Sequence, residues 1–241
     1  MSGDMGAPAQ LDHLVVMADT LEAGVSWCER TLGVTPAAGG AHPLMGTHNR
    51  LINVSGAAFA RAYLEIIAID PEVQPTRAAP LRRWFDMDDD ALRTEVAQNG
   101  PRLIHWVASV PGLAHVHADW SRLGIDRGAI LEASRPTPDG LLQWQITVRD
   151  DGRRLFDGCL PTLIQWGAQH PVQNLPASGV QLQSLHLAHP EAPRLEQALR
   201  AAHLPPGEFA TTMTMTTAHA PAPILRATFS TPRGPVTLSN R

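Results

Sequence analysis

The chain contains no lysine, so all 19 of its basic residues are arginines. This absence excludes chemistry that needs an amine side chain, such as a Schiff base with a carbonyl substrate or the lysine of a phosphate-binding P-loop. The chain also lacks a strong excess of charge of either sign, because its 23 acidic residues nearly balance the basic ones and leave a net charge of −4. The sequence therefore gives no electrostatic reason to expect nucleic acid or an anionic membrane as a partner.

Cysteine is scarce as well. Cys28 and Cys159 lie far apart and form no C-x-x-C motif, so neither a disulfide framework nor a zinc site built from cysteines is expected. No apolar run is long enough to cross a bilayer, and the first ten residues lack the basic and apolar regions of a signal peptide. We therefore expect a cytoplasmic protein. The absence of G-x-G-x-x-G, Walker and G-x-S-x-G motifs argues against nucleotide binding and serine hydrolysis.

One carboxylate stands in an otherwise apolar segment. Residues 63–70, YLEIIAID, have the aromatic and β-branched composition of a buried strand, with Glu65 in the middle. An unpaired buried charge costs several kcal/mol, so Glu65 must find a cation, take up a proton or lie in a wet cavity. Two interpretations stay open, which are an ion pair with a nearby arginine, Arg50 or Arg61, and a functional role.

The chain repeats one pattern, a strand and a helix followed by three strands. A segment rich in proline, arginine and aspartate connects the two copies and includes a short helix predicted at 91–98. A shorter third copy with fewer strands follows. The predicted units are 11–70 for the first module, 71–101 for the connecting segment, 102–171 for the second module and 180–241 for the partial third module.

The two copies carry polar residues at equivalent points. His13 and His105 lie in the first strands of their units, and Glu65 and Gln165 lie in the last strands. A single histidine is more often a core or surface residue without a function, so the repetition is what favours a shared site.

Two βαβββ units side by side resemble the glyoxalase-like domain proteins of the vicinal oxygen chelate superfamily. The segments LDHLVV, GTHNRLI, YLEIIAID, LIHWVAS and the final PTLIQW…HP carry the resemblance, which covers residues 11–171 well and the rest more loosely. It implies an α+β fold in which paired βαβββ modules form cupped mixed and antiparallel sheets, with a truncated third module. It also implies a metal ion in the cup, held by His13, Glu65, His105 and Gln165.

The resemblance further implies a metal-dependent enzyme that acts on a small molecule with vicinal oxygens, a lyase or an isomerase, with dioxygenase chemistry less favoured. Two imidazoles and a carboxylate suit Zn, Ni, Mn or Fe, and Glu65 would either bind the metal or carry a proton. Gln165 departs from the family pattern, because many metal-using relatives have a carboxylate there. This departure leaves open a second interpretation, a metal-free protein that binds and sequesters a small molecule. A homodimer is also left open.

Three further residues flank the strand before residues 63–70 and are candidates for the lining of the pocket: His42, His48 and Asn49. Turn chemistry explains them equally well. Trp106 and Trp166 are expected on the face of the sheet away from the ligands, where they would pack against helices.

Overall fold

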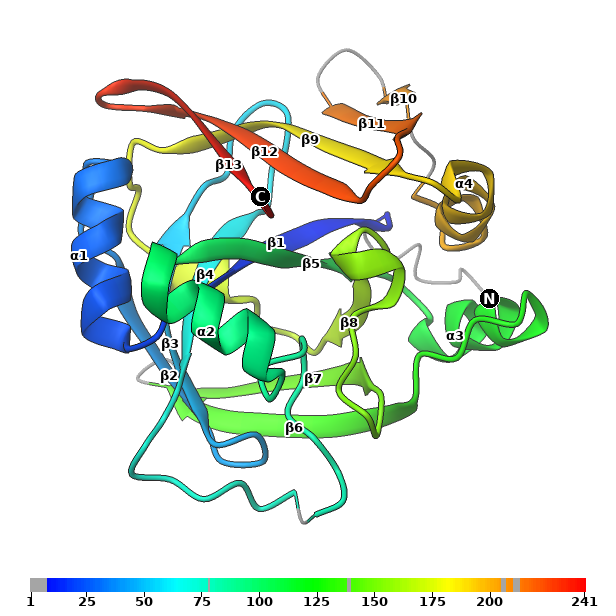
Figure 1. The fold of residues 1–241 in the computed structure, drawn as a ribbon, viewed down its shortest axis with the longest axis horizontal. Coiled ribbons are helices and arrows are strands. Elements are labelled where there is room, and N and C mark those ends of the chain that lie inside the picture. The colour runs from blue at the N-terminus through cyan, green and yellow to red at the C-terminus, as the bar shows by residue number, and fades with distance from the viewer. Residues whose placement is uncertain (1–7, 78, 138–139, 205–206, 210–212) are drawn as a thin grey trace.

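The computed structural model describes residues 8–77, 79–137, 140–204, 207–209 and 213–241. Within these residues, two β-sheets pack against each other and four α-helices lie around them (Figure 1). This architecture confirms the predicted α+β class. A membrane-spanning helix is absent from the described residues, because every helix there is too short or too polar. Cys28 and Cys159 are both buried and free.

The first module forms half of the larger sheet. Its helix α1 begins after Thr20, whose side-chain oxygen accepts a hydrogen bond from the backbone N–H of Ala23 at 3.1 Å. The helix ends before Gly33, which has a left-handed φ of +76°. The elements are β1 (Gln10–Met17), α1 (Leu21–Thr31), β2 (Ala37–His42), β3 (Thr47–Asn53) and β4 (Tyr63–Ile69).

The second module repeats this order and completes an eight-stranded sheet. β5 pairs antiparallel with β1, which gives the strand order β2-β3-β4-β1-β5-β8-β7-β6. In each module the last strand pairs parallel with the first, β4 with β1 and β8 with β5. The sheet curls into a half-barrel whose concave side is the cup (Figure 1). The elements are β5 (Arg102–Ser109), α3 (Leu113–Arg122), β6 (Ala129–Thr137), β7 (Gly140–Val148), the 3₁₀ helix η1 (Leu155–Gly158) and β8 (Thr162–Trp166).

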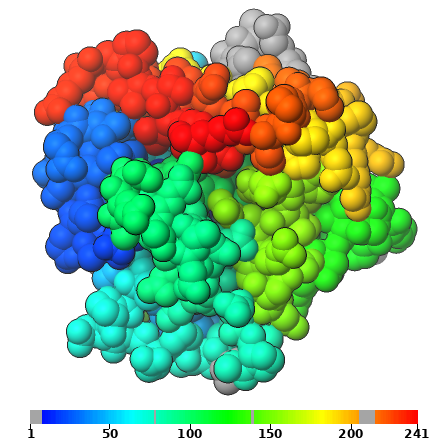
Figure 2. All heavy atoms as spheres, in the orientation of Figure 1, coloured from blue at the N-terminus to red at the C-terminus, as the bar shows by residue number. Residues whose placement is uncertain are grey.

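The segment between the modules does more than connect them. It contains the predicted helix, α2 (Asp90–Asn99), capped by the side chain of Asp89, which accepts from the backbone N–H of Leu92. In Figure 2 this segment covers one face of the half-barrel. Trp84 and Phe85 are buried in the core on the concave side of the sheet, so the segment inserts side chains into the cup.

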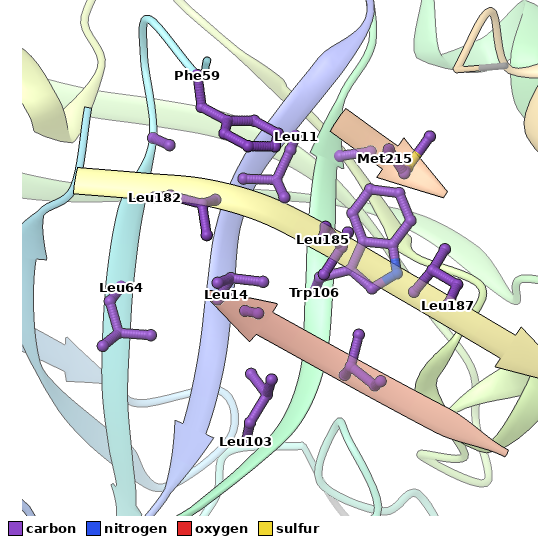
Figure 3. Packing of buried hydrophobic residues seen from close by; sticks show 14 of the residues in the cluster. Leu11, Leu14, Phe59, Leu64, Leu103, Trp106, Leu182, Leu185, Leu187 and Met215 are labelled. Atoms are coloured by element: carbon purple, nitrogen blue, oxygen red, sulfur yellow. The ribbon is translucent and has the colours of Figure 1, made fainter. Parts of the chain in front are cut away.

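The partial third module lies on the convex side of the half-barrel. It belongs to a five-stranded sheet of order β10-β11-β9-β12-β13, in which β11 pairs parallel with β9 as β4 does with β1. Leu182 and Leu185 pack against Leu14 and Trp106 of the larger sheet (Figure 3). Burying a leucine side chain contributes about 1.5–3 kcal/mol, so this contact joins the two sheets firmly. The elements are η2 (Pro171–Asn174, 3₁₀), β9 (Gln181–His189), α4 (Ala192–Ala201), β10 (Gly207–Phe209), β11 (Met213–His219), β12 (Ile224–Thr231) and β13 (Gly234–Ser239).

Candidate functional site

The cup holds a small chamber that adjoins a wider groove. The chamber has a volume of about 40 Å³, and its walls come from strands of both modules and from the segment that carries Trp84. The groove, of about 590 Å³, lies between β2 and the β6–β7 hairpin. The chamber and the groove share Leu51, Arg135, Leu142 and Pro171 in their walls, so the groove is the approach to the chamber.

A β-bulge in β1 shapes the floor of the site. Leu11 pairs with Ala108 of β5 and His13 with the next residue, Val107, which leaves Asp12 as an extra residue. In a regular strand, successive side chains point to opposite faces. The bulge removes this alternation locally and lets Asp12 contact His13, whose Nδ1 donates to Asp12 Oδ1 at 2.7 Å.

Asp12 is the centre of a buried hydrogen-bond network. Its Oδ2 accepts from Trp166 Nε1 at 2.8 Å and from His170 Nε2 at 3.1 Å. The other ring nitrogen of His170 accepts from the backbone N–H of Val172, which fixes the proton of His170 on Nε2. Burial raises the pKa of Asp12, but the hydrogen bonds from His13 and His170 and the electrostatic attraction of the two rings outweigh it and hold that pKa well below its usual value. Asp12 is therefore an ionised carboxylate that orients two histidines.

Glu65 lies beside His13 in the chamber. Its Oε1 accepts from Asn49 Nδ2 at 2.6 Å, and its Oε2 is 3.8 Å from His13 Nε2. Within the described residues Glu65 forms no ion pair with an arginine, so neither Arg50 nor Arg61 fills that role. The Glu65 carboxylate and the free ring nitrogen of His13 face each other in an enclosed space.

His42 and Tyr63 complete this side of the chamber as neutral groups. Burial lowers the pKa of His42 to about 3, and the charge of Arg135 adds to the effect. The ring of Tyr63 stacks on His13, with ring centres 4.4 Å apart. Burial, together with the Asp12 and Glu65 carboxylates, raises the pKa of Tyr63 well above its usual value. Both side chains remain uncharged near neutral pH, so they shape the site and offer hydrogen bonds.

His105 is enclosed within the second module. Its Nδ1 donates to the backbone oxygen of Gly158 at 3.2 Å, and its Nε2 accepts from the backbone N–H of Thr162 at 3.1 Å. The ring of Phe85 lies against it, with ring centres 5.1 Å apart. Burial, with the charges of Arg127 and Arg154, lowers the pKa of His105 well below its usual value. Both ring nitrogens are occupied, so His105 is a structural residue.

The last strand of the second module has the opposite register to the one expected. Gln165 faces away from the cup, and its Oε1 accepts from the backbone N–H of Leu113 at the start of α3 at 2.8 Å. Trp166 points into the chamber instead, so its expected packing against helices is wrong. Trp106 does lie in the core on the convex side, where its Nε1 donates to the backbone oxygen of Cys159.

Two of the three candidate lining residues reach the chamber. Asn49 and His42 are part of its wall, and the amide nitrogen of Asn49 lies 3.5 Å from His42 Nε2. His48 instead lies outside the chamber wall, with its Nδ1 3.6 Å from a carboxylate oxygen of Asp70.

The structure does not assemble the four-residue metal set that the family resemblance implies. His13 and Glu65 meet, while His105 and Gln165 use their polar atoms elsewhere. In the described part of the chain, no three His, Cys, Asp or Glu side chains form a group that could hold a metal ion. The donor set as arranged does not fit a metal centre of this kind.

Four important residues are missing from the sequence-based candidates: Asp12, Trp84, Phe85 and His170. In a regular strand Asp12 would face away from His13, so side-chain alternation keeps it out of the candidate site. Alternation takes no account of the bulge at Asp12. The adjacent aromatic residues Trp84 and Phe85 in a polar segment are a signal of burial that could have indicated their position. His170 belongs to the HP pair that helps to carry the family resemblance, but the sequence gives it no role in the site.

Comparison with known proteins identifies the family. Residues 11–203 match the family model of the glyoxalase-like domain. The chain belongs to this family. None of the curated proteins matches the chain.

Solved structures share the fold of this glyoxalase-like protein. A hypothetical protein from Staphylococcus aureus is 11% identical, with a TM-score of 0.60 over 89% of this chain and 88% of its own. A methylmalonyl-CoA epimerase from Streptomyces coelicolor is 18% identical, with a TM-score of 0.39 over 68% of this chain and 99% of its own. The corresponding epimerase from Mycobacterium tuberculosis is 14% identical, with a TM-score of 0.36 over 65% of this chain and 85% of its own. The Staphylococcus aureus structure, at 11% identity, shows a shared fold alone.

Proposed function

We propose that this protein is an enzyme that moves a proton within a small molecule with vicinal oxygens, an isomerase or a lyase, and that Glu65 and His13 carry the proton. The observation that supports this proposal is the 3.8 Å separation of Glu65 Oε2 and His13 Nε2 inside the chamber. Both side chains are fixed from behind, Glu65 by Asn49 and His13 by Asp12. Such positioning of an acid and a base is what general acid–base catalysis requires.

The reaction follows from the atoms that face the chamber. Glu65 removes a proton from a carbon next to a carbonyl group, and the electrons of the C–H bond form a C=C bond while those of the C=O bond move to oxygen. His13, protonated on both ring nitrogens with its Nδ1–H bound to Asp12, donates its Nε2 proton to that oxygen and becomes neutral. When the proton held by Glu65 passes to the former carbonyl carbon and the hydroxyl on the adjacent carbon gives up its own proton to His13 to become the new carbonyl, the product is an isomer. When the enol instead gives its O–H proton back to His13 and re-forms C=O, its C=C electrons shift and expel a leaving group from the next carbon, and the product is that of a lyase. Because the side chains of His13 and Glu65 are buried, little water reaches the enol intermediate.

The geometry favours transfer of the proton on a single face of the substrate. Inversion at a carbon needs two proton carriers on opposite faces, with the carbon between them. Two groups whose reactive atoms are 3.8 Å apart leave no room for a carbon between them. We therefore expect transfer between adjacent atoms on a single face, which suits isomerisation or elimination.

Deuterium exchange tests the proposal without knowledge of the natural substrate. We would incubate the protein with 2-oxo acids and hydroxyketones in D₂O containing a chelator, and follow the loss of C–H signals by NMR. Exchange is expected for at least one compound and should fall about 100-fold or more in Glu65→Gln and in His13→Gln, because acid–base groups contribute about 10²–10⁴ in rate. His48→Gln is the matched control, since His48 lies outside the chamber wall.

The outcomes separate the two candidate functions. Exchange that survives in both variants, or that appears only after Zn, Ni, Mn or Fe is added, would contradict the proposal. Ligand-dependent thermal stabilisation without exchange of any compound would favour the metal-free binding protein instead.

A further inference from the structure

Among the described residues that line the groove, Arg135 is the one arginine. Its guanidinium lies where the groove and the chamber meet, and it is part of both walls. The described lining residues of the groove include no Asp or Glu that could neutralise this charge. Among the described residues no ion pair with Arg135 is formed, although 11 other Arg and His side chains are paired with carboxylates.

The Nη1 atom of Arg135 is buried and has no hydrogen-bond partner among the described residues. A buried donor without an acceptor is costly, and a charged donor more so, which makes such atoms markers of a missing partner. Trp84 Nε1 is a second donor of this kind, and Trp84 is part of the same chamber wall. Both unpartnered atoms are donors, so the group that satisfies them must be an acceptor.

The guanidinium of Arg135 packs against Gly40 of β2, at the opposite edge of the sheet. A Cβ atom on Gly40 of β2 would lie 1.9 Å from Arg135 Nη1, so the absence of a side chain at Gly40 makes room for the arginine. Among the described residues that line the chamber, Glu65 is the one carboxylate, and it would repel a second anion placed beside it. An anionic group is therefore best accommodated against the guanidinium of Arg135.

We propose that Arg135 binds a carboxylate of the substrate, so that this site acts on a carboxylic acid. A carboxylate accepts hydrogen bonds only and matches the planar guanidinium of arginine. The carboxylate of the substrate would lie at the boundary of chamber and groove. The reacting carbons of the substrate would lie beside His13 and Glu65, and its apolar part against Leu51 and Leu142. This inference rests on the proposed function for the reaction, but carboxylate binding can be measured by itself.

Matched pairs of acids and amides test the inference. We would measure binding of phenylacetate and 2-oxobutyrate, and of the two corresponding amides, by thermal shift and calorimetry at concentrations up to about 10 mM. The acids should stabilise the protein and bind about tenfold or more tightly than the amides, because an amide is neutral and has only one strong acceptor. Equal binding of acid and amide, or no binding of either acid, would overturn the inference.

Two variants locate the carboxylate. Arg135→Gln removes the charge, and Gly40→Ala keeps the charge but displaces the guanidinium, so each should weaken acid binding about tenfold or more. Arg226→Gln, at an exposed arginine on the other sheet, should have no effect. Acid binding that is unchanged in both Arg135→Gln and Gly40→Ala would refute the assignment.

Glu65→Gln separates this inference from the proposed function. The variant should bind the acids at least as well as the native protein while it loses deuterium exchange. Exchange that persists in Glu65→Gln, together with acid binding that depends on Arg135, would reject the proposed reaction and leave the carboxylate site standing.

Discussion

Acidification should destabilise this protein well above the pH at which carboxylates begin to titrate. His105 and His42 are neutral in the folded state because burial lowers the pKa of each, to about 3 for His42. In the unfolded chain both return to the ordinary pKa of about 6.5. As the pH falls below 6.5 the unfolded state binds protons that the folded state does not, so stability is full above that pH and is lost below it.

The size of the effect follows from linkage. A histidine that is neutral when folded and has a pKa of about 6.5 when unfolded costs RT ln(1 + 10), or about 1.4 kcal/mol, at pH 5.5. His105 and His42 together should therefore remove about 3 kcal/mol between pH 7.5 and 5.5. Asp12 does not contribute in this window, because its pKa is lowered in the folded state and that stabilisation is lost only as the pH falls through its ordinary value near 4. A smaller contribution of the same sign comes from His186, which water screens.

Urea unfolding followed by tryptophan fluorescence at pH 7.5, 6.5 and 5.5 measures the free energy directly. His105→Gln and His42→Gln should each remove about half of the pH dependence, and the double variant most of it. His219→Gln is the control, since His219 is exposed. The reasoning is refuted if the native protein loses less than about 0.5 kcal/mol over this range, or if the double variant keeps the full dependence.

Four further predictions concern the site and the fold. Asp12→Asn should lower the free energy of unfolding in urea by about 3–5 kcal/mol, because it removes a buried charge from a network that it organises; a loss below about 1 kcal/mol would contradict this. Glu65→Gln should leave that free energy unchanged or higher, since its partner Asn49 donates to either side chain and no arginine is stranded; a loss of about 3–5 kcal/mol would reveal a cation partner. Zinc, nickel or manganese should not raise the melting temperature, and a rise that disappears in His13→Ala would show that a metal site forms after all. Gly128→Ala should lower the free energy of unfolding by about 2–4 kcal/mol, because the φ of Gly128 is +73° and an added Cβ would meet a backbone oxygen at 2.2 Å. Gly100→Ala is the control: its φ is also strained, but no atom lies within 4 Å of the added Cβ, so the loss should be only about 1 kcal/mol.

The sequence by itself determined the fold class and half of the site. Apolar periodicity and turn residues are local signals, so the two strand-helix-strand units and the helix at Asp90–Asn99 could be predicted. Alternation within residues 63–70 likewise placed Glu65 on one face of a buried strand together with Tyr63 and Ile67. Parallel pairing of β1 with β4 then brought Glu65 and His13 together.

Tertiary structure decided the rest, because a side chain's face depends on strand pairing. In β8 the observed faces are the reverse of the predicted ones, with Gln165 outside the cup and Trp166 inside it. Side chains alternate with a period of two, so an error of one residue in the register moves each side chain to the other face. The bulge that brings Asp12 beside His13 exists only in the pairing of β1 with β5, strands about 90 residues apart. Arg135 meets Gly40 only because the sheet curls until its two edge strands approach each other, a closure that no local pattern encodes.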